Sequence, residues 1–275
     1  MKKMIHWILY IALVARVGAM VFLGAKAYNH AIAYEEATKE LVTYHDAGQQ
    51  ASLKLEKFAK SLLGDLYDDD LKIQMDKVRE KQEYAMVKAK EYTIYFMALL
   101  ALLLILSFFI SLQAFTLFGS IAALLTLTLG LITPILMVTI HKEVEYLGDI
   151  VLSFESKGVI GSIVKLWETG DMVVALVILL FSVVVPVLKV LSLLIVSIFM
   201  QSRFAHGIIA FFKMIGKWSM VDVFVVAVFL VYLTANKGDV SKAEVEVGLY
   251  FFLAYVIVSM LVSLSADKML QKLKG

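Results

Sequence analysis

The 275-residue sequence contains no cysteine and only 2 prolines, and only 18% of its residues are charged. The absence of cysteine excludes disulfides, thiolate zinc sites, iron–sulfur clusters and cysteine nucleophiles from this chain. Soluble domains carry about 25% charged and about 45–50% apolar residues, whereas 61% of these residues are hydrophobic. The excess lies in long uncharged runs, so the sequence predicts a polytopic membrane protein.

Six apolar runs are candidates for transmembrane helices. A helix rises about 1.5 Å per residue, so about 20 residues cross a hydrocarbon core of about 30 Å. We predict transmembrane helices at 7–27, 94–112, 115–137, 172–199, 219–235 and 248–266. We interpret the first run as an uncleaved anchor, because it is longer than the apolar part of a signal peptide and no convincing cleavage site follows it.

The lysine and arginine residues indicate which side of the membrane each loop faces. With the N-terminus inside, segments 1–6, 200–218 and 267–275 hold eight basic residues and one acid, whereas loops 138–171 and 236–247 hold five basic and nine acidic residues. We therefore expect a multi-pass membrane protein with both termini in the cytoplasm.

The largest polar region, about 28–92, has a clear period. Spacings of three and four alternate through Tyr34, Ala37, Leu41, Tyr44, Gly48, Ala51, Leu55, Phe58 and Leu62, and again through Leu71, Met75, Val78, Gln82, Ala85, Ala89 and Tyr92. This spacing is typical of a coiled-coil seam, and the turn-like segment between the two halves predicts an antiparallel helical hairpin. By the orientation above, the hairpin stands on the outer side of the membrane. Three interpretations of the hairpin stay open: a rigid spacer, a docking arm for another envelope protein, or a ligand-sensing hairpin.

The outer loop 138–171 begins with β-branched, partly alternating residues. These predict two short strands within 138–154, around Gly148 and Asp149. Pro134 favours a helix that ends or bends near the outer end of the third span.

Motifs of catalysis are missing from the sequence. The histidines are scattered and make no plausible ligand set, and there is no phosphate loop, dinucleotide glycine pattern or serine nucleophile elbow. We therefore expect no enzyme activity, no metal or other cofactor and no nucleic-acid partner.

Charged residues fall inside the predicted spans. A charge at mid-membrane costs at least about 2.5–3.5 kcal/mol, so such residues usually face a partner or a wet cavity. Arg16 is expected to snorkel or to pair within the bundle. Ser182, Pro186 and Lys189 share a helix face by their spacing, and Pro186 leaves the carbonyl of Ser182 without its helical donor. Lys189 and Asp222 would form either a structural clamp or a polar lining for a transported head group.

Four motifs in the second half of the chain are characteristic as a set. They are GKWSMVDVFVVA at 216–227, FSVVVPVLK at 181–189, LITPILM at 131–137 and VGLY at 247–250. By these motifs, their order and their separation, the chain from Phe115 onward resembles one transmembrane module of the paraquat-inducible protein A family.

The resemblance implies a four-helix module with a small sheet outside the membrane. It implies a role in moving lipids between the inner and outer membranes of Gram-negative bacteria, beside MCE-domain proteins that form tunnels across the periplasm. Lipid would be handled in the polar interior of the module, which motif position assigns to Ser182, Pro186, Lys189, Ser219 and Asp222.

The chain also departs from the pattern of this family. Typical members have two modules, each preceded by a cysteine-rich zinc ribbon, whereas here one module is evident and cysteine is absent. A single module would need to form a homo-oligomer or to use a different partner.

The sequence thus predicts an all-α polytopic membrane protein with six transmembrane helices, an extracytoplasmic antiparallel coiled-coil hairpin and a small extracytoplasmic β element. We divide it into a two-helix unit with the hairpin, 1–112, and a four-helix module, 113–275. The expected function is that of an inner-membrane subunit of an MCE-type lipid transport system, with an MCE-domain protein and an envelope lipid such as a phospholipid as partners. The alternative is a membrane-anchored receptor or assembly scaffold whose hairpin senses or tethers a partner.

Overall fold

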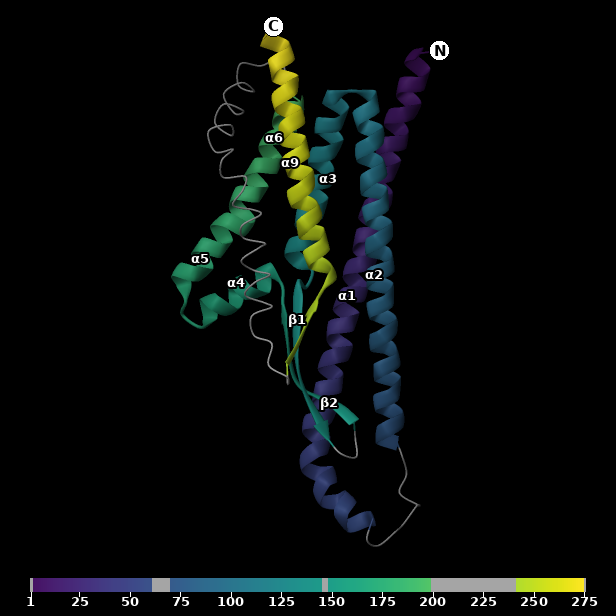
Figure 1. The fold of residues 1–275 in the computed structure, drawn as a ribbon, viewed down its shortest axis with the longest axis vertical. Coiled ribbons are helices and arrows are strands. Elements are labelled where there is room, and N and C mark those ends of the chain that lie inside the picture. Colours follow the sequence, from purple (N-terminus) through teal and green to yellow (C-terminus); the bar gives the residue numbers. More distant parts are fainter. Residues whose placement is uncertain (1, 61–69, 145–147, 199–240, 275) are drawn as a thin grey trace.

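The computed structural model describes residues 2–60, 70–144, 148–198 and 241–274. Two long helices run side by side along the molecule (Figure 1), namely α1 (Lys2–Lys60) and α2 (Asp70–Ile110). Shorter helices cluster beside their upper halves, and a small sheet lies beside their lower halves (Figure 1). The described N- and C-terminal ends lie at one end of the molecule, whereas the end of α1 and the beginning of α2 lie toward the other (Figure 1).

The helical hairpin has the seam that the sequence predicts, wherever its side chains are described. Tyr34, Ala37 and Leu41 on α1 are buried, as are Val78, Ala85 and Ala89 on α2. Gln82, another seam position, donates a hydrogen bond from Nε2 to Thr38 Oγ1 at 2.7 Å, and that hydroxyl donates to the carbonyl of Tyr34 at 2.8 Å. A polar layer therefore crosses the described part of the seam, between apolar side chains. Seam positions 44–62, 71 and 75 lie outside the residues whose side chains are described.

The third helix, α3 (Leu112–Ile132), differs from its prediction at both ends. Its N-cap is Ser111, whose hydroxyl accepts a hydrogen bond from the backbone of Ala114 at 3.0 Å. Leu112, predicted as the end of the second span, is therefore the first residue of α3. The helix ends before Thr133, which is extended (φ −84°, ψ 144°) because a residue that precedes proline disfavours the helical region. The prediction of a helix to residue 137 was wrong.

The β element is a three-stranded antiparallel sheet of order β2-β1-β3. Its strands are β1 (Leu136–Val144), β2 (Gly148–Lys157) and β3 (Ser241–Val245). The two predicted strands are thus confirmed and are longer than expected, with a register shift between Ile140 and His141. The third strand was not predicted. It comes from the segment before the last helix and pairs with the first half of β1, from Leu136↔Val245 to Ile140↔Ser241.

An arm of consecutive helices follows the sheet. It consists of α4 (Val159–Glu168), α5 (Met172–Leu179), a π-helical segment η2 (Leu180–Val184) and α6 (Val185–Ile198). The π turn ends at Val184, two residues before Pro186, whose missing N–H interrupts the ordinary hydrogen-bond ladder. The fourth predicted span is confirmed as the tilted rod α5-η2-α6 (Figure 1), whereas α4 was not predicted.

Five described helices are long and apolar enough to cross a membrane. They are Trp7–Val42, Asp76–Ile110, Leu112–Ile132, Met172–Ile198 and Val247–Met269, the last within α9 (Val247–Lys274). The chain is therefore a helical, polytopic membrane protein. The predicted span 219–235 lies outside the described residues, so the total of six remains a prediction.

One apolar core joins both halves of the chain. It contains side chains of α1, α2, α3 and α9, among them Leu13, Met20, Phe96, Leu103, Leu127 and Tyr255. Phe96 on α2 meets Phe251 on α9 edge to face, with ring centroids 5.0 Å apart. Gly130 lets α3 approach α9 closely, because an added Cβ would lie 2.8 Å from the backbone nitrogen of Phe252. The predicted division of the chain into a two-helix unit, 1–112, and a four-helix module, 113–275, stays a prediction, and the two units share this core.

Candidate functional site

Two polar residues of the fourth span, Ser182 and Lys189, are buried in the protein. Ser182 in η2 and Pro186 and Lys189 in α6 are all buried, with 5% of Ser182 and 7% of Lys189 exposed. The sequence predicted a common face from their spacing, and the shared burial agrees with it. A serine, a helix irregularity and an ammonium therefore lie on the inner face of one apolar helix.

The Lys189 side chain connects two helices. Its Nζ donates to Ser259 Oγ on α9 at 3.3 Å, and Ser259 Oγ donates to the carbonyl of Val256 at 3.1 Å. Ser259 is fully buried, and so is Val190, which follows the lysine on α6. The ammonium is thus held against a hydroxyl among apolar side chains, where electrostatic interactions are stronger than in water.

Ser259 is a site residue that sequence reasoning missed. The only signal is a hydroxyl in an apolar stretch of the last span, and α9 contains other serines as well. Periodicity shows which residues share a helix face but does not show which helix lies opposite.

Ser219 and Asp222, the other two predicted members of the site, lie outside the described residues. The predicted pairing of Lys189 with Asp222 therefore stays a prediction. Among the residues that the structure describes, no three histidine or carboxylate side chains gather as metal ligands would. The chemistry that the described part of the site offers is a positive charge with a neighbouring hydroxyl, which suits an anionic group such as a phosphate.

A second polar layer fixes the other end of the same helices. Thr116 Oγ1 and Ser265 Oγ are 3.1 Å apart, joining α3 to α9. Ser197 on α6 donates to the carbonyl of Gln113 at 3.5 Å, joining α6 to α3. Hydrogen bonds between membrane helices are worth about 0.6 kcal/mol on average and rarely reach 2 kcal/mol. These contacts orient α6, and thereby Lys189, against α9.

Arg16, the remaining charge predicted inside a span, is engaged within its own helix. Its Nη1 donates to the carbonyl of Ala12, one turn earlier on α1, at 3.2 Å, and the side chain is partly buried. This geometry agrees with a side chain that turns back toward the helix N-terminus, as a snorkelling arginine does. The described hydrogen bond of Arg16 does not reach the α6–α9 pair.

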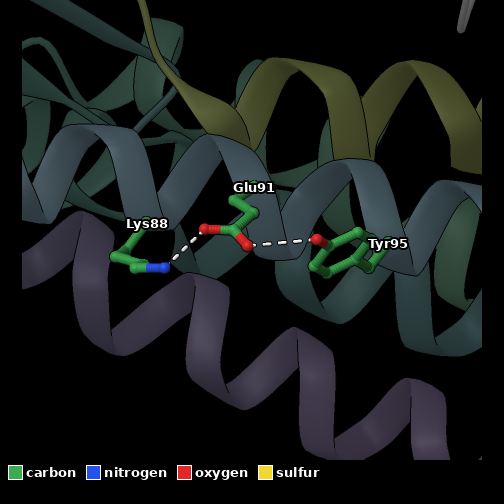
Figure 2. A network of polar contacts seen from close by, with 3 residues as sticks. All are labelled: Lys88, Glu91 and Tyr95. Atoms are coloured by element: carbon green, nitrogen blue, oxygen red, sulfur yellow. Dashed lines mark hydrogen bonds and ion pairs between the residues drawn. The ribbon is translucent and has the colours of Figure 1, made fainter.

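A polar and aromatic cluster lies on α2 where its apolar part begins along the chain. Figure 2 shows Glu91 between two partners: Lys88 Nζ lies 2.6 Å from Oε2, and the Tyr95 hydroxyl lies 3.1 Å from Oε1. On α1, the His30 ring stacks on Tyr92 with centroids 5.5 Å apart and an interplanar angle of 12°. Tyrosines and lysines of this kind gather where a helix leaves the hydrocarbon. The cluster therefore indicates where the hairpin would leave the membrane.

The sheet is attached to the hairpin just beyond this boundary. Met137 at the start of β1 is fully buried and packs with Tyr34 of α1 and Ala85 of α2. The helix α1 also contacts β2, where Glu35 lies beside Ser156. The hairpin and the sheet consequently form one packed structure, a relationship between distant segments that the sequence did not reveal.

Known proteins resemble the second half of the chain. The family model described as Paraquat-inducible protein A matches residues 114–271, which is more than half of the chain. The proteins named Intermembrane transport protein PqiA from Escherichia coli strain K12 and from Shigella flexneri are each 29% identical to it over 115 residues. This match covers 40% of the chain and 27% of each relative, so the chain spans about a quarter of their length. No solved structure matches the chain.

Proposed function

Because the chain belongs to the paraquat-inducible protein A family, we propose that it is a membrane subunit of a lipid transport system, and not an enzyme. Its relatives are named intermembrane transport proteins. Their match covers only part of each protein, so their activity enters here as part of the proposal. Lipids would move between the inner and outer membranes, in a system that includes an MCE-domain protein of the periplasm.

The chain would lie in the bacterial inner membrane with both termini in the cytoplasm. The excess of basic residues in segments 1–6, 200–218 and 267–275 supports this orientation. The described ends of the chain lie at one end of the molecule and the sheet lies toward the other (Figure 1), as this orientation requires. The hairpin and the sheet would then both face the periplasm.

The lipid would be handled at the α6–α9 pair. The observation that supports this proposal is Lys189, an ammonium buried in an apolar bundle and hydrogen-bonded to Ser259 on another helix. A phospholipid head group carries the negative charge that such a site attracts. Ser182, Ser219 and Asp222 would complete the polar lining, and the irregular turn before Pro186 would give it local room.

The partner would dock on the hairpin. The packing of Met137 against Tyr34 and Ala85 supports this idea, because a partner bound to the hairpin would be mechanically connected to the module. A second copy of the chain would supply the second module that typical members contain. The same hairpin supports the alternative function, a receptor or assembly scaffold in which the bundle serves only as an anchor.

The Lys189→Met substitution separates these two functions. It removes the charge and keeps much of the side-chain volume, and Asp222→Ala removes the proposed counterpart. Ser192→Ala is the matched control, because the Ser192 hydroxyl only donates to the carbonyl of Leu188 on its own helix. We expect Lys189→Met and Asp222→Ala to lose copurified phospholipid, measured by mass spectrometry, and to weaken the outer-membrane barrier at unchanged protein level. Wild-type lipid content and barrier function in both variants would contradict transport and favour the scaffold.

A further inference from the structure

The helix α4 has two distinct faces. Its apolar residues recur at spacings of three and four, namely Val159, Ile160, Ile163, Val164, Leu166 and Trp167. The opposite face carries Ser162, Lys165 and Glu168. Such a division is typical of a helix that lies at a boundary between an apolar and an aqueous phase.

The protein covers only part of the apolar face. Val159 and Ile163 are buried, whereas Ile160, Val164 and Trp167 are 40%, 51% and 50% exposed. We call these last three residues the α4 stripe. In a helix they follow one another at spacings of four and three, so they form one continuous strip beside the buried side chains.

Each end of α4 adjoins a transmembrane helix: its first turn lies beside the end of α3, and its last turn leads into α5. At its start, a Cβ added to Gly158 would lie 3.4 Å from the carbonyl oxygen of Thr133, the residue that follows α3. At its end, Gly170 (φ 92°) turns the chain, and Asp171 N donates to the carbonyl of Leu166 at 2.9 Å. The next span begins at Met172. The helix therefore lies at the level where α3 leaves the membrane and α5 enters it.

The α4 stripe continues into a surface that faces lipid. Met172, Val173 and Val174 at the start of α5 are exposed and belong to a span of the membrane. Figure 1 shows α4 beside the lower end of α5, with its axis at an angle to the axes of α3 and α9. The stripe thus adjoins side chains of α5 that face lipid. This position favours lipid over a soluble protein as the partner of the stripe.

We propose that α4 is an interfacial helix whose stripe inserts into the membrane leaflet on the side of the sheet. Trp167 lies at the level of the head groups and upper acyl chains, while Lys165 and Glu168 face water, as in other amphipathic surface helices. Ten residues are too few to cross the bilayer, so the helix lies along the surface. Its insertion holds the outer end of the rod α5-η2-α6, which carries Lys189.

Tryptophan fluorescence tests the position of the stripe. The chain contains 3 tryptophans, so replacing Trp7 and Trp218 by phenylalanine leaves Trp167 as the only tryptophan, which is excited selectively. The protein is reconstituted in phosphatidylcholine vesicles that carry bromine at shallow or deep acyl positions. We expect strong quenching by the shallow label, weaker quenching by the deep label, and little quenching by aqueous acrylamide.

The control moves the tryptophan to the other face of the same helix. In the same background without Trp7 and Trp218, Lys165→Trp combined with Trp167→Phe places the only tryptophan on the polar face, where acrylamide should quench it and brominated lipid should not. Equal responses from both positions would overturn the proposal. Protection of Trp167 from both quenchers would also overturn it, because a protein surface would then cover the stripe. Neither outcome depends on whether the chain transports lipid.

Discussion

Lys189 on α6 donates a hydrogen bond to Ser259 on α9 at 3.3 Å, with both side chains buried. The two interpretations of this lysine predict different stabilities for a protein that lacks its side chain. In a closed clamp with Asp222, loss of the lysine leaves a buried carboxylate without its partner, which destabilises a protein by about 3–5 kcal/mol. In a polar lining that water or a head group reaches, the remaining groups stay solvated.

We expect Lys189→Met to leave the thermal stability unchanged or slightly raised. The substitution removes the desolvation cost of a buried ammonium, and the hydrogen bond to Ser259 that it loses is worth about 0.6 kcal/mol between membrane helices. The measurement is the unfolding temperature of the detergent-purified protein, with Ser192→Ala as control. A destabilisation of about 3–5 kcal/mol would instead indicate a clamp. Any loss of lipid from this variant would then follow from unfolding.

The contact between hairpin and sheet gives a second prediction. Met137→Ala removes a fully buried side chain between Tyr34 and Ala85, and such changes cost about 2–5 kcal/mol. We expect a lower unfolding temperature and faster proteolysis of the hairpin. Met172→Ala is the control, since Met172 is exposed on α5 and its loss leaves no cavity. Equal unfolding temperatures for the two variants would contradict the packed contact.

The packing of α3 against α9 gives a third prediction. Gly130→Ala places a methyl group 2.8 Å from the backbone nitrogen of Phe252, so the two helices must separate, and overpacking of this kind costs about 1–3 kcal/mol. In Gly18→Ala nothing lies within 4 Å of the new methyl group. There the better helix propensity of alanine predicts a neutral or mildly stabilising change. The unfolding temperatures of the two variants test this difference. If Gly130→Ala is as stable as Gly18→Ala, the close packing of α3 on α9 is refuted.

The features that local periodicity encodes could be predicted from the sequence. The buried seam at Tyr34, Ala37 and Leu41 and the shared face of Ser182 and Lys189 both follow from spacing along one helix. Proline chemistry indicated an irregularity before Pro186, although not that a π turn would accommodate it. The spacing of α4 was also present in the sequence, within a segment that we assigned wholly to an outer loop.

The features that depend on contacts between distant segments could not be predicted. Ser259 lies 70 residues after Lys189, and nothing in either segment states that the two helices face each other. Strand β3 is only 5 residues long, and its alternation is too short to distinguish it from a loop until β1 lies beside it. The packing of Met137 on the hairpin likewise joins segments that belong to separate patterns in the sequence.

The last prediction concerns the hairpin as a docking arm. Leu41 and Val78 pack together across the seam, so a short glycine-rich linker can join residue 42 to residue 76 in place of segment 43–75. This deletion keeps Tyr34 and Ala85, which contact Met137, whereas removing 34–92 would uncover that buried side chain. We expect the shortened protein to keep its unfolding temperature and copurified lipid, but to lose the MCE-domain partner in affinity purification. If the partner still copurifies at the full-length level, it does not dock on the outer part of the hairpin.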